Sequence, residues 1–154
     1  MRRLLATVAV LGFALPAAAG AGVRGPGDGT LSVLDGRGTF AVRAQGGIIG
    51  TFVRGRVVIT DPDPNDGTGP IVTGDDWHRD RSDTTTVYGG THVRFRLIGG
   101  SFKIRVIGTG VNLSVVGRGT VSLTGEGTAD DGTDSIDGGD YVSVPDTQTT
   151  FSLP

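Results

Sequence analysis

Residues 92–108 read HVRFRLIGGSFKIRVIG, two short runs in which every second position is apolar. Successive side chains of a β-strand point to opposite faces, so each run predicts a strand with one apolar and one basic face. The glycine pair Gly99-Gly100 between the runs marks a turn. This stretch therefore predicts two antiparallel, half-buried strands of one sheet.

The same alternation recurs around residues 31–33, 40–44, 111–115 and 121–123, and no segment after the amino-terminal leader has a helical period. Glycines separate the runs at intervals of eight or nine residues, at Gly38, Gly46 and Gly55 and again at Gly100, Gly108 and Gly117. Short strands with regular turn signals predict an all-β fold, a single antiparallel β-sandwich or barrel of about 8–10 short strands.

The two glycine series are related to each other. Residues 38–56 align without a gap on residues 100–118, and the identities outside glycine are Phe40/Phe102, Arg43/Arg105, Val53/Val115 and Arg56/Arg118. We interpret this as a duplicated four-stranded unit, with pseudo-repeats at about 30–60 and 91–124. Convergence of strand and turn patterns is the alternative, because short strands constrain sequence weakly.

The amino terminus has the composition of a bacterial secretory signal peptide. Arg2 and Arg3 precede an apolar stretch, Leu4–Leu15, that is followed by small-residue cleavage sites. We expect residues 1–21 to be removed and residues 22–154 to form a single domain that is extracellular or periplasmic, with association with the cell envelope as an option. The apolar stretch is short for a membrane span, and no later segment is a transmembrane candidate; an uncleaved anchor is the alternative.

The chain has 14 basic and 16 acidic residues, a formal net charge of -2 and no cysteine. Disulfides and thiol catalysis are therefore excluded, and a general nucleic-acid binder, which would be basic, is not expected. Basic charge is nevertheless concentrated: residues 37–60 contain four arginines and residues 91–124 contain five cations, with no acid in either range. Such outward cations protect strand edges, or they form a face for a cell-wall or anionic polysaccharide.

Residues 61–90 have little apolar content and predict a long loop. The run Asp61-Pro-Asp63-Pro-Asn65-Asp66-Gly67 places oxygen donors at alternate positions, as calcium loops do. The glycine comes one place late and Val72 stands where a closing glutamate is expected. A proline-rigid turn with local Asx hydrogen bonds is the alternative to a calcium site.

The second polar cluster is Asp75-Asp76-Trp77-His78-Arg79-Asp80. In an extended chain Asp76, His78 and Asp80 point to one side and Trp77 to the other. Two carboxylates with a histidine predict a transition-metal site or an acid–base pair. Trp77, the only tryptophan, together with His78 forms a candidate binding surface for a sugar or a protein. The alternative is that Trp77 folds back to cover one end of the barrel and that the acids and His78 simply face solvent.

No nucleophile elbow, phosphate-cradling loop or other catalytic motif is present, so no catalytic residue is predicted. The first hypothesis is a secreted, non-catalytic domain with a binding or structural role, whose partner is an envelope polysaccharide or a protein. A metal-dependent enzyme using Asp76, His78 and Asp80 is one alternative. A calcium-stabilised structural domain is the other.

Overall fold

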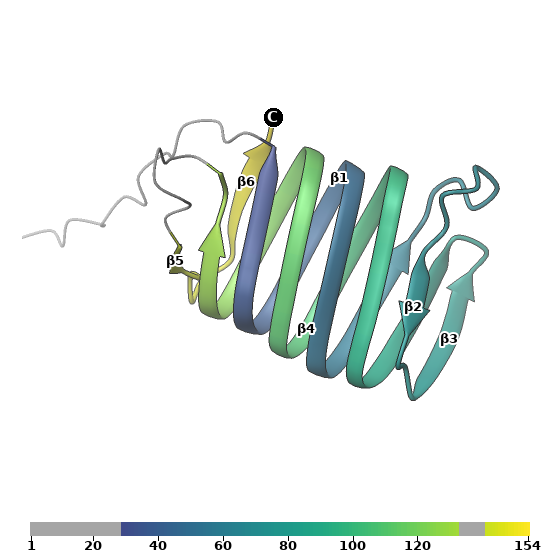
Figure 1. The fold of residues 1–154 in the computed structure, drawn as a ribbon, viewed down its shortest axis with the longest axis horizontal. Coiled ribbons are helices and arrows are strands. Elements are labelled where there is room, and N and C mark those ends of the chain that lie inside the picture. Colours follow the sequence, from purple (N-terminus) through teal and green to yellow (C-terminus); the bar gives the residue numbers. More distant parts are fainter. Residues whose placement is uncertain (1–28, 133–140) are drawn as a thin grey trace, which may run out of the picture.

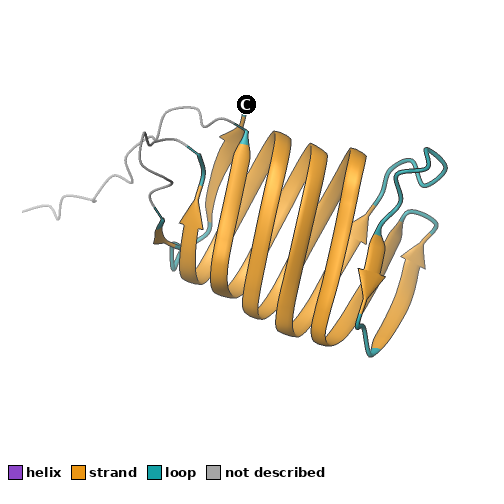
Figure 2. Cartoon of the chain, viewed as in Figure 1, coloured by secondary structure: helices purple, strands orange, loops and turns teal. Residues whose placement is uncertain are grey.

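The computed structural model describes residues 29–132 and 141–154, so the predicted signal peptide lies outside the described residues. Six strands make up this part of the chain: β1 (Thr30–Thr60), β2 (Ile71–Thr73), β3 (Trp77–Ser82), β4 (Thr85–Asp130), β5 (Val142–Ser143) and β6 (Thr149–Leu153). All belong to one antiparallel sheet in which each of the other strands pairs with β4. The predicted all-β antiparallel fold is confirmed (Figure 2).

The two long strands wind around each other as a flattened coil (Figure 1). Most residues of β1 have two partners on β4: Thr39 lies opposite both Ile107 and Thr124, for example. A strand can have a partner on both edges only if β4 passes it twice, so β1 lies between successive turns of β4. The sheet remains open and is not closed into a barrel.

The register divides the coil into two sides. Side one consists, in spatial order, of β6, residues 118–125, 38–45, 101–108, 54–60 and 85–91, and β3. Side two consists of β5, residues 128–130, 30–34, 112–116, 47–52 and 93–98, and β2. Neighbouring segments on each side are antiparallel. The chain crosses from one side to the other at the top and bottom of the coil (Figure 1).

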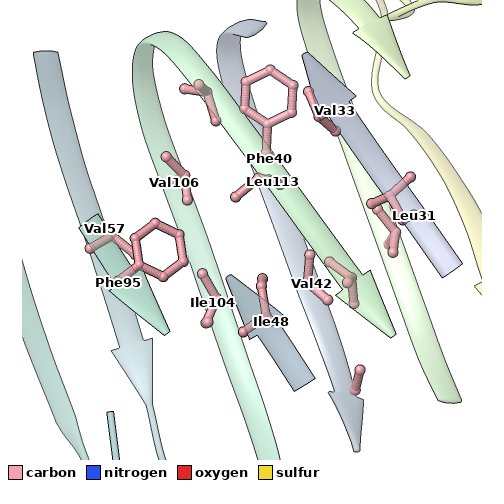
Figure 3. Packing of buried hydrophobic residues seen from close by; sticks show 14 of the residues in the cluster. Leu31, Val33, Phe40, Val42, Ile48, Val57, Phe95, Ile104, Val106 and Leu113 are labelled. Atoms are coloured by element: carbon pink, nitrogen blue, oxygen red, sulfur yellow. The ribbon is translucent and has the colours of Figure 1, made fainter. Parts of the chain in front are cut away.

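The apolar members of each alternating run point between the two sides and form one core (Figure 3). Its largest fully buried side chains include Phe40, Phe52, Phe95 and Phe102. Large rings are accommodated beside glycines: a Cβ on Gly50 would overlap the ring of Phe95, and one on Gly36 the ring of Phe40. With no cysteine in the chain, this packing is what stabilises the domain.

Glycine makes the corners of the coil. Gly125, Gly38, Gly108, Gly55 and Gly90 lie side by side on successive strand segments. Gly38 has a φ of 145° and Gly55 a φ of 155°, values that L-residues rarely adopt. Backbone pairing continues through these corners, and this is why two long strands replace most of the expected eight to ten short ones.

The two segments that match each other in sequence lie next to each other in the structure. β1 covers the whole of the expected first unit, and the expected second unit lies within β4. Residues 38–45 pair in antiparallel register with residues 108–101, so the segments that match in sequence are neighbours. The duplication itself stays a prediction.

Residues 61–90, expected as a long loop, instead contain β2, β3 and the first residues of β4. These strands add to the open edges of the coil, where β4 supplies backbone partners to segments with few apolar side chains. Every residue of β3 is exposed because it extends beyond the core. None of the described residues belongs to a helix long and apolar enough to cross a membrane.

Candidate functional site: a basic face on side one

The outer face of side one gathers cations that are far apart in sequence. Because the core residues of each segment point inward, their neighbours at alternate positions point to solvent. The cations placed on this outer face by that rule are Arg43, Arg56, Arg79, Lys103, Arg105 and Arg118. They come from five different segments of β1, β3 and β4.

No acid opposes these cations across the face. The one acidic residue in the strand segments of side one is Asp80, and it lies opposite Thr86 on the core-facing side. Among the described residues, the ion pairs found are Arg37 with Glu126, at 3.9 Å, and His78 with Asp75. None of the six cations takes part in either pair, so their charge is directed to solvent.

A shallow groove of about 270 Å³ runs across the middle of this face. Lys103 lies directly opposite Arg43 on one neighbouring segment and Thr60 on the other, and Arg105 occupies the same strand two residues further on. Neighbouring strands are about 4.8 Å apart, so the three cations form one cluster. The uncharged lining combines apolar and hydroxylated residues: Ala41, Val42, Val58, Ile104 and Val121, with Thr60, Thr120, Ser122 and Thr150.

Trp77 lies at the β3 edge of the same outer face. It pairs with Gly89, and a Cβ on Gly89 would overlap the indole ring, so the ring lies against the glycine backbone. Arg56 flanks Gly89 on the next segment. The tryptophan side chain remains 49% exposed. Sequence patterning suggested a loop tryptophan, whereas the structure makes Trp77 the first residue of β3.

The expected metal trio is only partly assembled. His78 and Asp80 share the core-facing side of β3, opposite Tyr88 and Thr86, as expected from alternation. Asp76 precedes β3, and its Oδ2 accepts hydrogen bonds from the Thr91 N–H (3.0 Å) and hydroxyl (3.3 Å).

The remaining polar groups of this cluster also have separate partners. His78 Nδ1 lies 3.3 Å from Asp75 Oδ2, and the Thr86 hydroxyl donates to Asp80 Oδ1 at 2.6 Å. The His78 ring packs on that of Tyr88, with centroids 5.9 Å apart. Partial burial of Tyr88 raises the pKa of its hydroxyl above the usual value, and the negative charges of Asp80 and Asp75 raise it further.

The segment Asp61–Gly67 forms the local turn that was the alternative to a calcium loop. Asp61 Oδ1 accepts from the Asp63 N–H at 3.1 Å. Asp66 Oδ1 accepts from the N–H and hydroxyl of Thr68, bonds that lower the pKa of the Asp66 carboxyl. Asp63 and Asn65 are exposed. Within residues 29–132 and 141–154, no three His, Asp or Glu side chains are arranged to hold a metal ion.

Asp61 differs from the other acids of this turn. It is only 7% exposed, and its Oδ2 has no hydrogen-bond partner among the described residues. Calcium binding through Asp61, Asp63, Asn65 and Asp66 stays a prediction with a direct test. An ion that binds the native state at a hundred times its Kd stabilises it by about 2.7 kcal/mol.

We therefore expect a calcium-binding protein to melt several degrees higher in calcium than in EDTA, as followed by far-UV circular dichroism. Asp61→Asn, which keeps the Oδ1 acceptor but removes the charge, is expected to abolish that difference. Identical melting midpoints in calcium and EDTA would exclude the calcium-stabilised alternative.

Comparison of the chain with protein-family models, with curated proteins and with solved structures gives no match. The molecule is thus defined by its own architecture: an all-β, open antiparallel coil with a basic groove on one outer face.

The sequence showed that the cations lie on the predicted strands. It did not show that cations from different strands come together in one groove. Lys103, Arg105 and Arg43 were visible only as members of two separate basic runs. The hydroxyl lining from Thr120, Ser122 and Thr150 had no signal at all, because serine and threonine on a solvent face are commonplace. The repeat offered one usable clue: Arg43 and Arg105 occupy equivalent positions in the two units.

Proposed function

We propose that this protein is a secreted, non-catalytic domain that binds an anionic polysaccharide of the cell envelope through the outer face of side one. The observation that carries the proposal is the groove lined by Arg43, Lys103 and Arg105 with no acid on the same outer face. The chain as a whole has a net charge of -2, so this concentration of positive charge is local.

The distribution of acidic residues supports a binding site that is confined to side one. Acidic residues gather in residues 61–83 and 126–132, at the β2/β3 end and the β5 end of the coil respectively (Figure 1). Negative charge therefore lies at the two ends and positive charge between them on side one. A polyanion is attracted to such a strip and repelled by the acids at the two ends of the coil, so binding is directed to the outer face of side one.

The shape of the site favours an extended polymer over a compact ligand. The groove is shallow, whereas sites for small molecules are concave and enclose most of their ligand. Arginine guanidinium groups form paired hydrogen bonds with carboxylates or phosphates. The hydroxyl groups of Thr120 and Ser122 supply further donors beside the cations, while the Thr150 hydroxyl donates to Ser122 Oγ at 3.1 Å.

Trp77 favours a polymer that contains sugar rings. Three strand spacings, or about 14 Å, separate β3 from the segment that carries Lys103 and Arg105. A polymer that fills the groove and continues across the strands reaches the exposed indole face. Aromatic faces pack against apolar ring faces, and a pyranose offers one where a simple polyphosphate does not.

The test compares two variants that each lose two positive charges. Arg43→Gln/Arg105→Gln removes cations from the groove, and Arg37→Gln/Arg94→Gln removes cations that lie outside it. An exposed charge-assisted contact contributes about 1 kcal/mol, so the groove variant is expected to bind polygalacturonate ten- to thirtyfold more weakly in low salt. The control variant is expected to bind within about threefold of the unsubstituted protein, because it leaves the groove cations in place.

Isothermal titration calorimetry on the chain from Gly22 onward measures both affinities. Equal losses for the two variants would mean that only overall charge matters and would remove the groove from the proposal. Trp77→Ala identifies the ligand class: it should weaken polygalacturonate binding and leave inorganic polyphosphate binding unchanged. Failure of both polymers to bind would overturn the proposed function.

A further inference from the structure

The outer face of side two has a different character from that of side one. It carries four aliphatic residues that are more than half exposed: Ile49 (56%), Ile71 (51%), Ile98 (63%) and Val116 (60%). Ile98 and Val116 both lie opposite Gly47, and Ile49 is two residues further along that strand. Grouped, exposed aliphatic side chains of this kind mark an interaction surface.

We infer that this face binds a second copy of the same chain, forming a two-fold symmetric dimer. The argument rests on one row of residues across side two. In register order the row is Asp130, Ser32, Ser114, Ile49, Arg96 and Ile71. Asp130 lies two strands to one side of Ser114 and Arg96 two strands to the other, each about 10 Å away.

This row is self-complementary under one choice of axis. A two-fold axis that lies in the interface and runs along residues 112–116 exchanges the two halves of the row. It places Arg96 of each copy against Asp130 of the other and Ile49 against Ser32, which is the isologous arrangement of a closed dimer. An axis at right angles to the strands would place Arg96 against Arg96. The charge pattern therefore selects the first arrangement.

The size of the face sets the expected strength. Five strand segments at about 4.8 Å and about six residues at 3.3 Å give a patch of roughly 20 Å by 20 Å. That is smaller than the roughly 800 Å² that each partner contributes to a standard stable interface. The dimer is therefore expected to be weak and to depend on protein concentration.

Dimerisation through side two leaves both basic faces free and directs them away from each other. Resting on the proposed function, this makes the dimer a bivalent binder that bridges two polymer chains. Each site engages one chain, and linkage of the sites raises the overall avidity.

Sedimentation equilibrium over a concentration series measures dimerisation, and variants that swap the charges of Arg96 and Asp130 test the proposed contact. Arg96→Glu and Asp130→Arg are each expected to weaken dimerisation at least tenfold, and the double variant is expected to restore it to within about threefold of the unsubstituted protein. Arg94→Glu is the matched control, because the same axis places Arg94 against Thr128 and not against an acid. It should change the dissociation constant less than threefold.

A protein that stays monomeric at every concentration overturns the inference, as does an Arg94→Glu effect equal to that of Arg96→Glu. Binding of the monomer to vesicles of anionic phospholipid through Ile49 and Ile98 would instead assign the face to a membrane and also overturn it. The polymer assay separates this outcome from the proposed function. The Arg96→Glu variant should keep calorimetric binding to polygalacturonate while losing the turbidity that bridging produces.

Discussion

Replacing Gly55 by alanine is expected to destabilise the protein by about 3 kcal/mol or more, one of the largest effects of any single substitution. Gly55 sits at a corner of the coil with a φ of 155°, between Gly108 and Gly90 on the neighbouring segments. An alanine Cβ would overlap the carbonyl oxygen of Ile107 and the Cα of Gly108. Those are backbone atoms, so the overlap is relieved only by parting β1 from β4.

Urea unfolding followed by far-UV circular dichroism measures this loss, and Gly69→Ala is the matched control. A Cβ on Gly69 meets no atom within 4 Å, so its alanine variant should unfold at nearly the same urea concentration as the unsubstituted protein. Equal unfolding midpoints for the Gly55 and Gly69 variants would contradict the glycine-cornered coil.

Phe95→Ala is expected to cost about 4–5 kcal/mol, near the upper end for loss of a buried phenylalanine. Phe95 is buried in the core (Figure 3). Its ring occupies the space that a side chain on Gly50 of the next strand would take. Glycine has no side chain that could move into the resulting cavity, and Leu113, whose Cδ2 borders the same space, is too small to replace the ring. Domains of this size are stable by about 5–15 kcal/mol, and this one has no disulfide.

The same urea titration tests this substitution against Arg94→Ala on the adjacent position. Arg94 points to solvent, so its truncation should change the free energy of unfolding by less than about 0.5 kcal/mol. If Phe95→Ala lowers the free energy of unfolding by less than about 1.5 kcal/mol, the core must collapse into the space of the missing ring. That result would contradict the tight packing of Phe95 against Gly50.

These two predictions show where sequence reasoning was informative. The buried position of Phe95 follows from alternation with Arg94 and Arg96. The glycine intervals anticipated that Gly38 and Gly55 end one run and begin another. Alternation could not reveal that pairing continues through these corners, because a turn that reverses the chain and a corner that winds it have the same glycine signal.

The sequence predicted that a basic face exists, but it did not predict which residues make up the groove. The absence of acids from residues 37–60 and 91–124 indicated a basic face. The metal and acid–base hypotheses for Asp76, His78 and Asp80 stay predictions. In the structure Asp76 accepts a hydrogen bond from Thr91 and Asp80 accepts one from Thr86. Those partners lie on β4, outside the cluster itself, and the local spacing of carboxylates carries no information about them.

Local chemistry in the sequence accounts for the strands, for the inward or outward direction of each side chain and for the positions of the corners. It does so because alternation and glycine φ values are properties of a residue and its nearest neighbours. The winding of β1 between successive turns of β4 joins residues 30–60 to residues 85–130, and short strands carry no local record of their partners. That winding alone decides that Arg43, Lys103 and Arg105 share a groove on one side, while Ile49, Arg96 and Asp130 share a row on the other.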